Sequence, residues 1–124
     1  YDDEISRRRQ IAEIYQKNLE NIEHIMLPPK PEKNSKHFDI YQNYEIEAEN
    51  RESLRDFLQK KGVGTILQWG GFALHQFNEL HFKGEFEYTE RMTKNFMLLP
   101  MHTMLSDNDV NYICEQVISF YDNN

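Results

Sequence analysis

The sequence predicts an α+β fold, in which a small antiparallel sheet of about three strands has helices packed on one face. Two observations support this prediction. Apolar residues recur at helical spacing near both ends of the chain, whereas short apolar or alternating segments between them are typical of strands. A length of 124 residues with 39% hydrophobic residues suits a single domain over residues 1–124.

The first element is expected to be a long helix from about Asp3 to Asn21. Acidic residues at positions 2–4 favour a helix start, because the N-terminal end of a helix dipole attracts negative charge. A single apolar stripe follows at spacings of seven, three, four and three residues: Ile5, Ala12, Tyr15, Leu19 and Ile22. Residues 24–27 then have the character of a short strand, which Pro28 stops.

The middle of the chain begins with a polar connector, residues 28–37, that is rich in proline and lysine. From His37 to Ala48 an alternating pattern predicts a long extended run, whose inward face carries Phe38, Ile40, Tyr44, Ile46 and Ala48. Asn50 is a suitable N-cap for a following helix, and Gly62 can supply its left-handed exit.

The last third of the chain predicts two short strands, a loop and a brief helix. Residues 65–67 have the character of a short strand that leads into the loop 68–71. A brief helix is expected near Thr89–Lys94, followed by a strand at Phe96–Leu99 that Pro100 ends.

The C-terminal helix has the clearest start signal in the chain. Ser106 and Asp109 have the three-residue spacing of a capping box. A continuous apolar stripe lies behind them: Val110, Ile113, Cys114, Val117, Ile118 and Tyr121. Cys114 is therefore expected to pack in the core rather than to act as a nucleophile.

Composition excludes several classes of function. A net charge of −7 argues against non-specific nucleic-acid binding, which needs a broad basic surface. The single cysteine forms no internal disulfide and suits the reducing cytoplasm, and no apolar run reaches the roughly 20 residues that a membrane helix needs. The five histidines have no metal-ligand spacing, so no metal site is expected.

The candidate binding segment runs from Gln68 to His75. Gln68 offers a hydrogen-bond donor and acceptor, Trp69 a flat apolar face, and His75 a group that titrates near neutral pH. The glycines at 70 and 71 would let a ligand approach the backbone closely. This combination suits a polar ring such as a sugar. The alternative is an ordinary turn in which Trp69 and His75 pack against the sheet.

Three segments of the chain are informative together: RRRQIAEIYQKNL at 7–19, HFDIYQNYEIEAENRESLRDFLQKKGVGT at 37–65 and FMLLPMHTMLSDNDVNYICEQVISFY at 96–121. In this order and spacing they resemble the C-terminal region of the DegT/StrS sugar aminotransferases, which depend on pyridoxal phosphate. The resemblance covers nearly the whole chain. The QWGG sequence at 68–71 departs from the commonest family version and is similar to the branch that acts at C3 of dTDP-linked 3-keto-6-deoxyhexoses.

The resemblance implies that the chain is the C-terminal small domain of a fold type I aminotransferase, whose cofactor domain precedes it and is absent here. Pyridoxal phosphate would be bound by that domain, so no catalytic or cofactor-binding residue is expected in this chain. The substrates would be a nucleotide-linked keto sugar and an amino-acid donor, in a homodimeric enzyme. Gln68, Trp69 and His75, with Gln76 behind them, would contact the substrate. The alternative is a free-standing α+β interaction or ligand-binding module.

Overall fold

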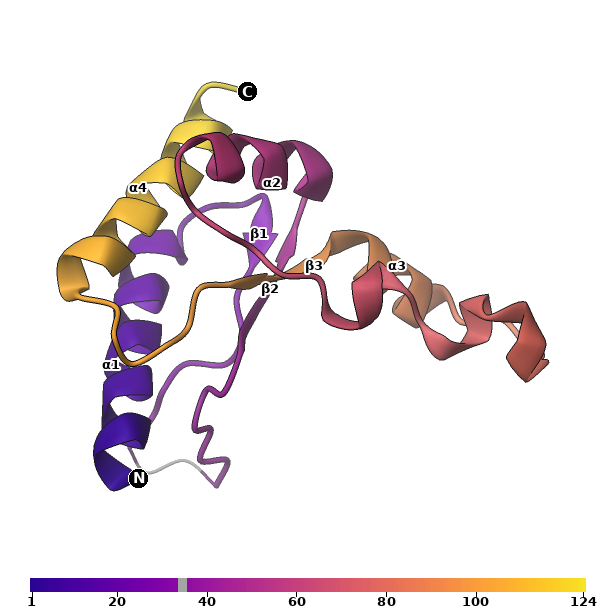
Figure 1. Cartoon of the computed structure of the whole chain (residues 1–124), viewed down its shortest axis with the longest axis horizontal. Coiled ribbons are helices and arrows are strands. Elements are labelled where there is room, and N and C mark those ends of the chain that lie inside the picture. The colour runs from indigo at the N-terminus through magenta and orange to yellow at the C-terminus, as the bar shows by residue number, and fades with distance from the viewer. Residues whose placement is uncertain (34–35) are drawn as a thin grey trace.

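The computed structural model describes residues 1–33 and 36–124, and a three-stranded antiparallel sheet lies at its centre (Figure 1). The strands are β1 (Ile25–Met26), β2 (Tyr44–Ala48) and β3 (Phe96–Leu99), and β2 lies between the other two. Residue 44 pairs with 99 and residue 46 with 97, whereas β1 pairs with β2 through two residues only. The predicted small antiparallel sheet is confirmed.

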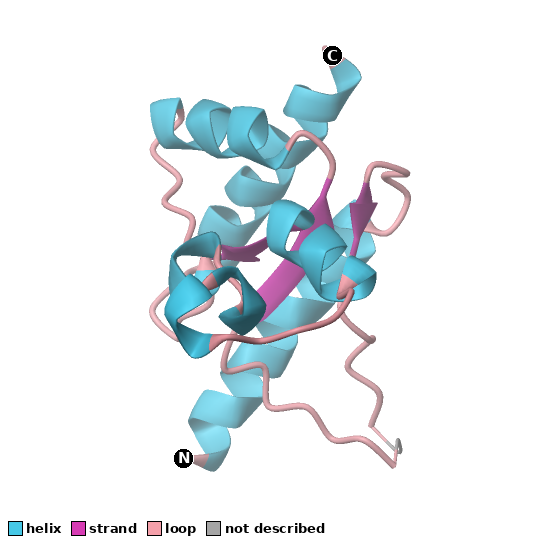
Figure 2. Cartoon of the chain, turned by 90° about the vertical axis from the view of Figure 1, so that its right-hand side faces the viewer, coloured by secondary structure: helices cyan, strands magenta, loops and turns pink. Residues whose placement is uncertain are grey.

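Three helices cover one face of the sheet: α1 (Asp2–Leu19), α2 (Arg51–Lys60) and α4 (Asp107–Asp122). The shorter helix α3 (Glu87–Asn95) lies on the other side, where Arg91 approaches Glu47 of β2 at 3.7 Å. Figure 2 shows the strands between the helical turns in front and the long N-terminal helix behind. The predicted α+β architecture is therefore present among the described residues.

One face of the sheet contributes to the hydrophobic core. Tyr44 and Ile46 of β2 and Met97 of β3 are almost fully buried against the helices, because alternate residues of a strand point to the same side. The opposite face carries Glu45 and Glu47 beside Phe96 and Leu98. The helices complete the core with buried residues that include Ile11, Tyr15, Leu54, Leu58, Val110 and Val117.

Two buried groups on the helices have environments that suppress ionisation. The Tyr15 ring stacks on Tyr44 with 4.7 Å between centroids, and its hydroxyl donates a 2.7 Å hydrogen bond to the Pro100 carbonyl. Cys114 is 1% exposed, and burial raises the pKa of its thiol to about 12. The thiol therefore stays protonated at neutral pH, and the prediction that Cys114 packs in the core is confirmed.

The predicted long strand from His37 is wrong before Tyr44. Tyr41 adopts a left-handed conformation with φ of +50°, which breaks the extended run and turns its ring into the core. Its hydroxyl donates a 2.5 Å hydrogen bond to the Pro29 carbonyl, and its amide donates to Asp39 Oδ1 at 2.7 Å. Local side-chain hydrogen bonding thus overrides the alternating pattern.

Other boundaries also differ from the prediction. Residues 65–67 form no strand, and only Ile66 bridges to Leu98. Asn50 precedes α2 as predicted but has a φ of +53° and makes no side-chain capping bond. The first helix ends at Leu19, two residues earlier than expected, and the strand predicted at 24–27 contracts to Ile25–Met26.

The helix and strand boundaries that the sequence predicted from glycine, proline and the capping box are confirmed. Gly62 has a φ of +80° just after α2. The Asp109 amide donates to Ser106 Oγ at 3.1 Å, and the Ser106 amide donates to the Asp109 carboxylate at 2.8 Å. On the last helix Phe120 is buried, whereas the predicted Ile118 and Tyr121 are only partly buried.

No helix in the described part of the chain has the length and hydropathy to cross a membrane.

Candidate functional site

The candidate site lies on a projection that we call the arm, residues 67–92 (Figure 1). We call the other described residues, 1–33, 36–66 and 93–124, the body. No residue between Val63 and Thr93 is buried. The arm contains three short turns of 3₁₀-helix, Gln68–Gly71, Leu74–Gln76 and Asn78–Leu80, before it returns through α3.

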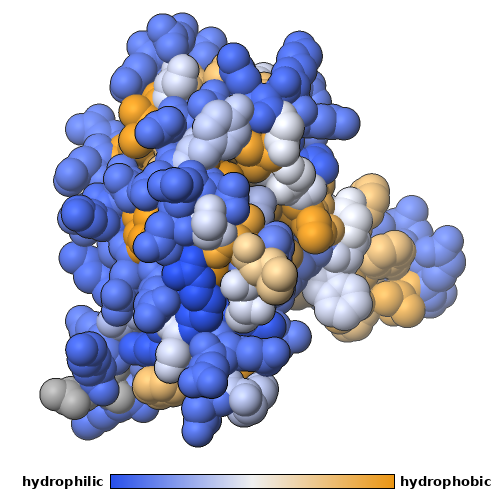
Figure 3. All heavy atoms as spheres, turned by 60° about the vertical axis from the view of Figure 1, so that its left-hand side comes forward, coloured by the Kyte–Doolittle hydropathy of each residue, from blue (hydrophilic) through white to orange (hydrophobic). Residues whose placement is uncertain are grey.

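The arm exposes many large apolar side chains, which Figure 3 shows gathered along the projection. Six of them come before α3 and one lies on it: Trp69, Phe72, Leu74, Phe77, Leu80, Phe82 and Tyr88. A monomeric protein seldom exposes so many apolar side chains together unless the surface binds something. The arm therefore has the character of a binding surface.

Trp69 is the most exposed of these apolar side chains, with 84% of its surface accessible. Its φ of +54° is followed by +64° at Gly70 and +81° at Gly71, so three consecutive residues are left-handed. The left-handed region is unfavourable for a bulky side chain, and residues held in it are concentrated at functional sites. The alternative in which Trp69 packs against the sheet is wrong.

His75 lies inside the arm, with 13% of its side chain exposed. Its ring packs on Phe86 at 4.7 Å between centroids, rather than on the sheet. Nε2 lies 3.4 Å from a carboxylate oxygen of Glu90 but forms no hydrogen bond there. A protonated imidazole would gain an ion pair with this carboxylate.

The other two predicted site residues have different positions. Gln76 turns back on its own loop, where its side-chain oxygen accepts a 2.8 Å hydrogen bond from the Ala73 amide. Gln68 is half-buried at the beginning of the arm. The structure thus brings His75 together with Phe86 and Glu90, which sequence reasoning missed. Their four-residue spacing at the start of a helix, which places them on one face, was the available signal.

A concave region lies on the body. It is a cavity of about 590 Å³ between the segment after α2, the end of β3 and the beginning of α4. Its polar lining includes Thr65, His102 and Tyr112. The Asp109 carboxylate also lines it, but the hydrogen bonds from Ser106 occupy this group and lower its pKa. The volume is typical of small-molecule sites.

The chain offers no lysine suited to binding pyridoxal phosphate covalently. All eight lysines are exposed, at positions 17, 30, 33, 36, 60, 61, 83 and 94. A lysine that forms a Schiff base is usually desolvated or placed beside another cation so that its amine is reactive. The lysines of this chain therefore do not fit the covalent attachment of this cofactor.

Comparison with known protein families identifies the class of protein. Residues 1–118 match the DegT/DnrJ/EryC1/StrS aminotransferase family, and the chain belongs to this family.

Individual relatives agree with this assignment. GDP-perosamine synthase from Escherichia coli O157:H7 is 32% identical over 127 residues, which cover 97% of this chain and 32% of the relative. The aminotransferase TlmJ from Streptoalloteichus hindustanus superposes with a TM-score of 0.87 at 26% identity, over 98% of this chain and 33% of that one. A DegT DnrJ EryC1 StrS aminotransferase from Brucella abortus gives 0.80 at 28% identity, over 95% and 31%. The chain spans about a third of the length of the curated relatives it matches.

Proposed function

We propose that this chain is the C-terminal small domain of a pyridoxal-phosphate-dependent enzyme that transfers an amino group from an amino acid to a nucleotide-linked keto-deoxysugar. Family membership supports the aminotransferase class. The observation that carries the proposal is the arm, on which Trp69 is 84% exposed while the body has a closed core. The arm would form one wall of the substrate pocket, and the cofactor would be held by residues outside this chain.

The arm residues would have different roles in substrate recognition. The exposed Trp69 face would stack on a ring of the substrate, and the Gln68 amide could donate and accept hydrogen bonds there. His75, beside Glu90, could hold a proton close to the substrate. Gln76 would keep the turn in shape through its bond to Ala73. The cofactor supplies the electron sink for transamination, and these residues would orient the sugar and exclude water.

The similarity of the QWGG sequence to the branch that acts at C3 of dTDP-linked 3-keto-6-deoxyhexoses favours such a sugar as the substrate. A GDP-linked sugar is the second candidate, because a relative 32% identical to this chain is named GDP-perosamine synthase. Incubation of the complete protein with pyridoxal phosphate, L-glutamate and each keto sugar separates the two candidates. Mass spectrometry would show which nucleotide sugar gains an amino group. Amination of neither sugar would contradict the proposal.

The role of the arm is tested in the same assay with Trp69→Ala. The expected result is a fall in kcat/KM of roughly 5- to 150-fold, because loss of stacking on an aromatic side chain costs about 1–3 kcal/mol. Met26→Ala is the matched control, since Met26 is also an exposed apolar side chain but lies on the edge strand β1. Equal activity of both variants would show that the indole does not contact the substrate.

We also propose that the complete enzyme is a homodimer, because a surface as apolar as the arm is suited to an intermolecular interface. Light scattering after size-exclusion chromatography would report twice the mass of one chain. If the 124-residue chain instead proves to be a complete translation product without aminotransferase activity, the alternative of a free-standing binding module is favoured.

A further inference from the structure

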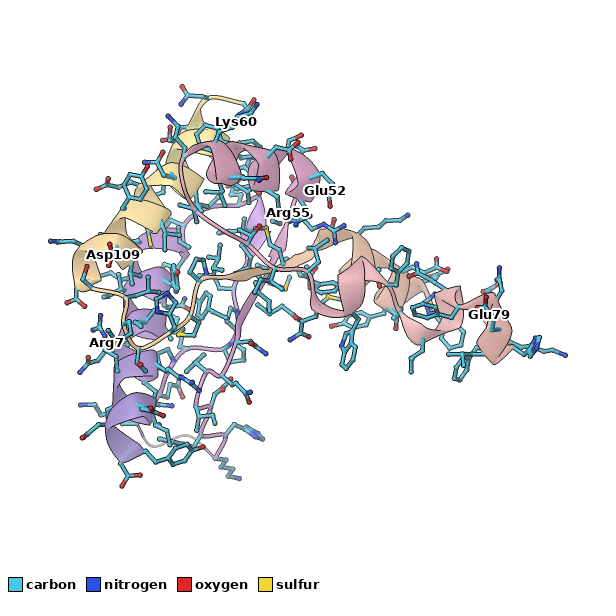
Figure 4. The ribbon with its side chains drawn as sticks, in the orientation of Figure 1. Arg7, Glu52, Arg55, Lys60, Glu79 and Asp109 are labelled. Carbon is cyan, nitrogen blue, oxygen red and sulfur yellow. The ribbon has the colours of Figure 1, made fainter. Side chains whose placement is uncertain are left out.

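The structure points to a role for the first turn of α2 that the family assignment does not provide. We infer that Arg51, Glu52 and Arg55 are positioning residues, which hold both ends of the arm and fix its direction relative to the body. Figure 4 shows Arg55 extending from α2 toward the place where the arm leaves the body, whereas Lys60 lies at the other end of the helix.

Arg55 holds the outgoing end of the arm. Its Nε donates a 3.2 Å hydrogen bond to Thr65 Oγ1, two residues before the arm begins. The next residue, Ile66, exchanges two backbone hydrogen bonds with Leu98 of β3, at 2.9 and 3.3 Å. Arg55 and β3 therefore fix two consecutive residues at this end.

Arg51 holds the returning end. One nitrogen of its guanidinium donates to the Thr93 carbonyl and also to the Phe96 carbonyl, the latter at 3.3 Å. The Arg51 side chain is only 12% exposed, and Thr93 is the first buried residue after the arm. Charge-assisted hydrogen bonds from a largely buried guanidinium are among the stronger ones in proteins, so this end is firmly held.

Glu52 joins the two arginines. One of its carboxylate oxygens lies 2.8 Å from Arg51, and the other lies 3.3 Å from Arg55. Because the Glu52 side chain is 65% exposed, these ion pairs add little stability. Their effect is geometric, because a single carboxylate orients both guanidinium groups. The two ends of the arm are therefore held by the same helical turn.

The position of Arg51 is unfavourable for the helix itself. A cation in the first turn meets the positive end of the helix dipole, where acidic residues are preferred. Asn50, just before it, has a φ of +53° and provides no side-chain cap. Residues that are unfavourable for the secondary structure in which they lie are concentrated at sites where they have another function. We call residues 65–66 and 93–96, where the arm joins the body, the root of the arm. The contacts of Arg51 with Thr93 and Phe96 in this root account for an arginine at this position.

The direction of the arm depends on its root because the arm has no buried residue of its own. A small rotation at the root would displace Trp69, which lies beyond it. The consequence for substrate use rests on the proposed function, whereas the consequence for arm geometry does not.

Arm geometry is tested by measuring the distance between spin labels on Glu79→Cys in the arm and Lys17→Cys on α1, both exposed positions. Cys114 is buried and protonated, so it would stay unlabelled. A single narrow distance distribution is expected in this background and with the control Lys60→Ala. Arg51→Ala combined with Arg55→Ala should broaden the distribution at least twofold, and Arg51→Lys with Arg55→Lys should restore part of the order.

A narrow, unshifted distribution in a double alanine variant whose circular dichroism is native would overturn the inference. If that variant fails to fold, Thr65→Val decides the question, because it removes only the acceptor of Arg55. It is expected to broaden the distribution as Arg55→Ala does, and a native distribution would overturn the role of Arg55.

The complete enzyme gives a second, independent readout. Arg55→Ala should lower kcat/KM by roughly 10- to 100-fold, since a displacement of about 1 Å near a substrate has an effect of that size. Lys60→Ala should leave kcat/KM unchanged. Absence of aminotransferase activity in the unmodified enzyme would contradict the proposed function, while the spin-label distances would still decide whether the arginines position the arm.

Discussion

The body and the arm differ in how their structure is stabilised. The body buries side chains from α1, α2, α4 and two strands in a common core, whereas residues 64–92 bury none. Hydrophobic burial is the main source of folding free energy, so nearly all of it resides in the body. The arm instead keeps its apolar groups accessible. The difference shows that the buried core and the exposed apolar side chains occupy separate parts of this chain.

The largest expected effect is on the body. Leu54→Ala removes a fully buried side chain of α2 and should lower the free energy of unfolding by about 2–5 kcal/mol. Chemical denaturation monitored by circular dichroism measures this change. A loss well below 1 kcal/mol would mean that α2 is not part of the common core.

A smaller effect on stability is expected where α1 contacts the segment after β3. Tyr15→Phe removes the hydroxyl that donates to the Pro100 carbonyl at 2.7 Å but keeps the stacked ring. The expected loss is about 1 kcal/mol, because the carbonyl is left without this donor. The same denaturation measurement tests it, and an unchanged free energy would show that water replaces the hydroxyl without cost.

A pH-dependent effect is expected on the sheet face that α3 partly covers. Burial, and then the neighbouring Glu47, raise the pKa of Glu45. Ionisation is therefore less favourable in the folded than in the unfolded chain, and the carboxylate destabilises the protein above its folded pKa. Glu45→Gln should raise the melting temperature slightly at neutral pH. The gain should vanish as both states become protonated below about pH 4. An equal gain at both pH values would assign the effect to packing instead.

The smallest effect on stability is expected in the arm. Trp69→Ala should change the free energy of unfolding by no more than about 0.5 kcal/mol, because the indole is 84% exposed. Since Trp69 is the only tryptophan, the fluorescence of the chain should also report a solvent-exposed indole. A loss above about 1 kcal/mol would remove the distinction between arm and body.

The sequence predicted those elements of the fold that have strong local signals. The Ser106–Asp109 capping box, Gly62 and Pro100 marked boundaries that the structure confirms. The sequence did not predict where β2 begins. The alternating pattern places Tyr41 on the outward face, and only its contacts with Pro29 and Asp39 show that it leaves the extended conformation and turns inward.

The candidate site was predictable as a segment but not as a surface. Gly70 and Gly71 drew attention to Trp69, and the structure exposes its ring. The arm as a unit was not predicted, because its short 3₁₀ turns have no apolar periodicity. Arg51 and Arg55 were not singled out either. Their partners are a backbone carbonyl some forty residues away and a threonine hydroxyl beyond the end of the helix, which no local pattern reveals.

An arm without buried residues also has an evolutionary consequence. Most substitutions reduce the stability of a protein, and a domain near its stability threshold tolerates few of them. Changes between residues 67 and 92 are largely exempt from that limit, because they do not disturb the packing of the body. Selection can therefore alter the side chains of the arm, and even accept insertions there, while the packing of the body remains intact.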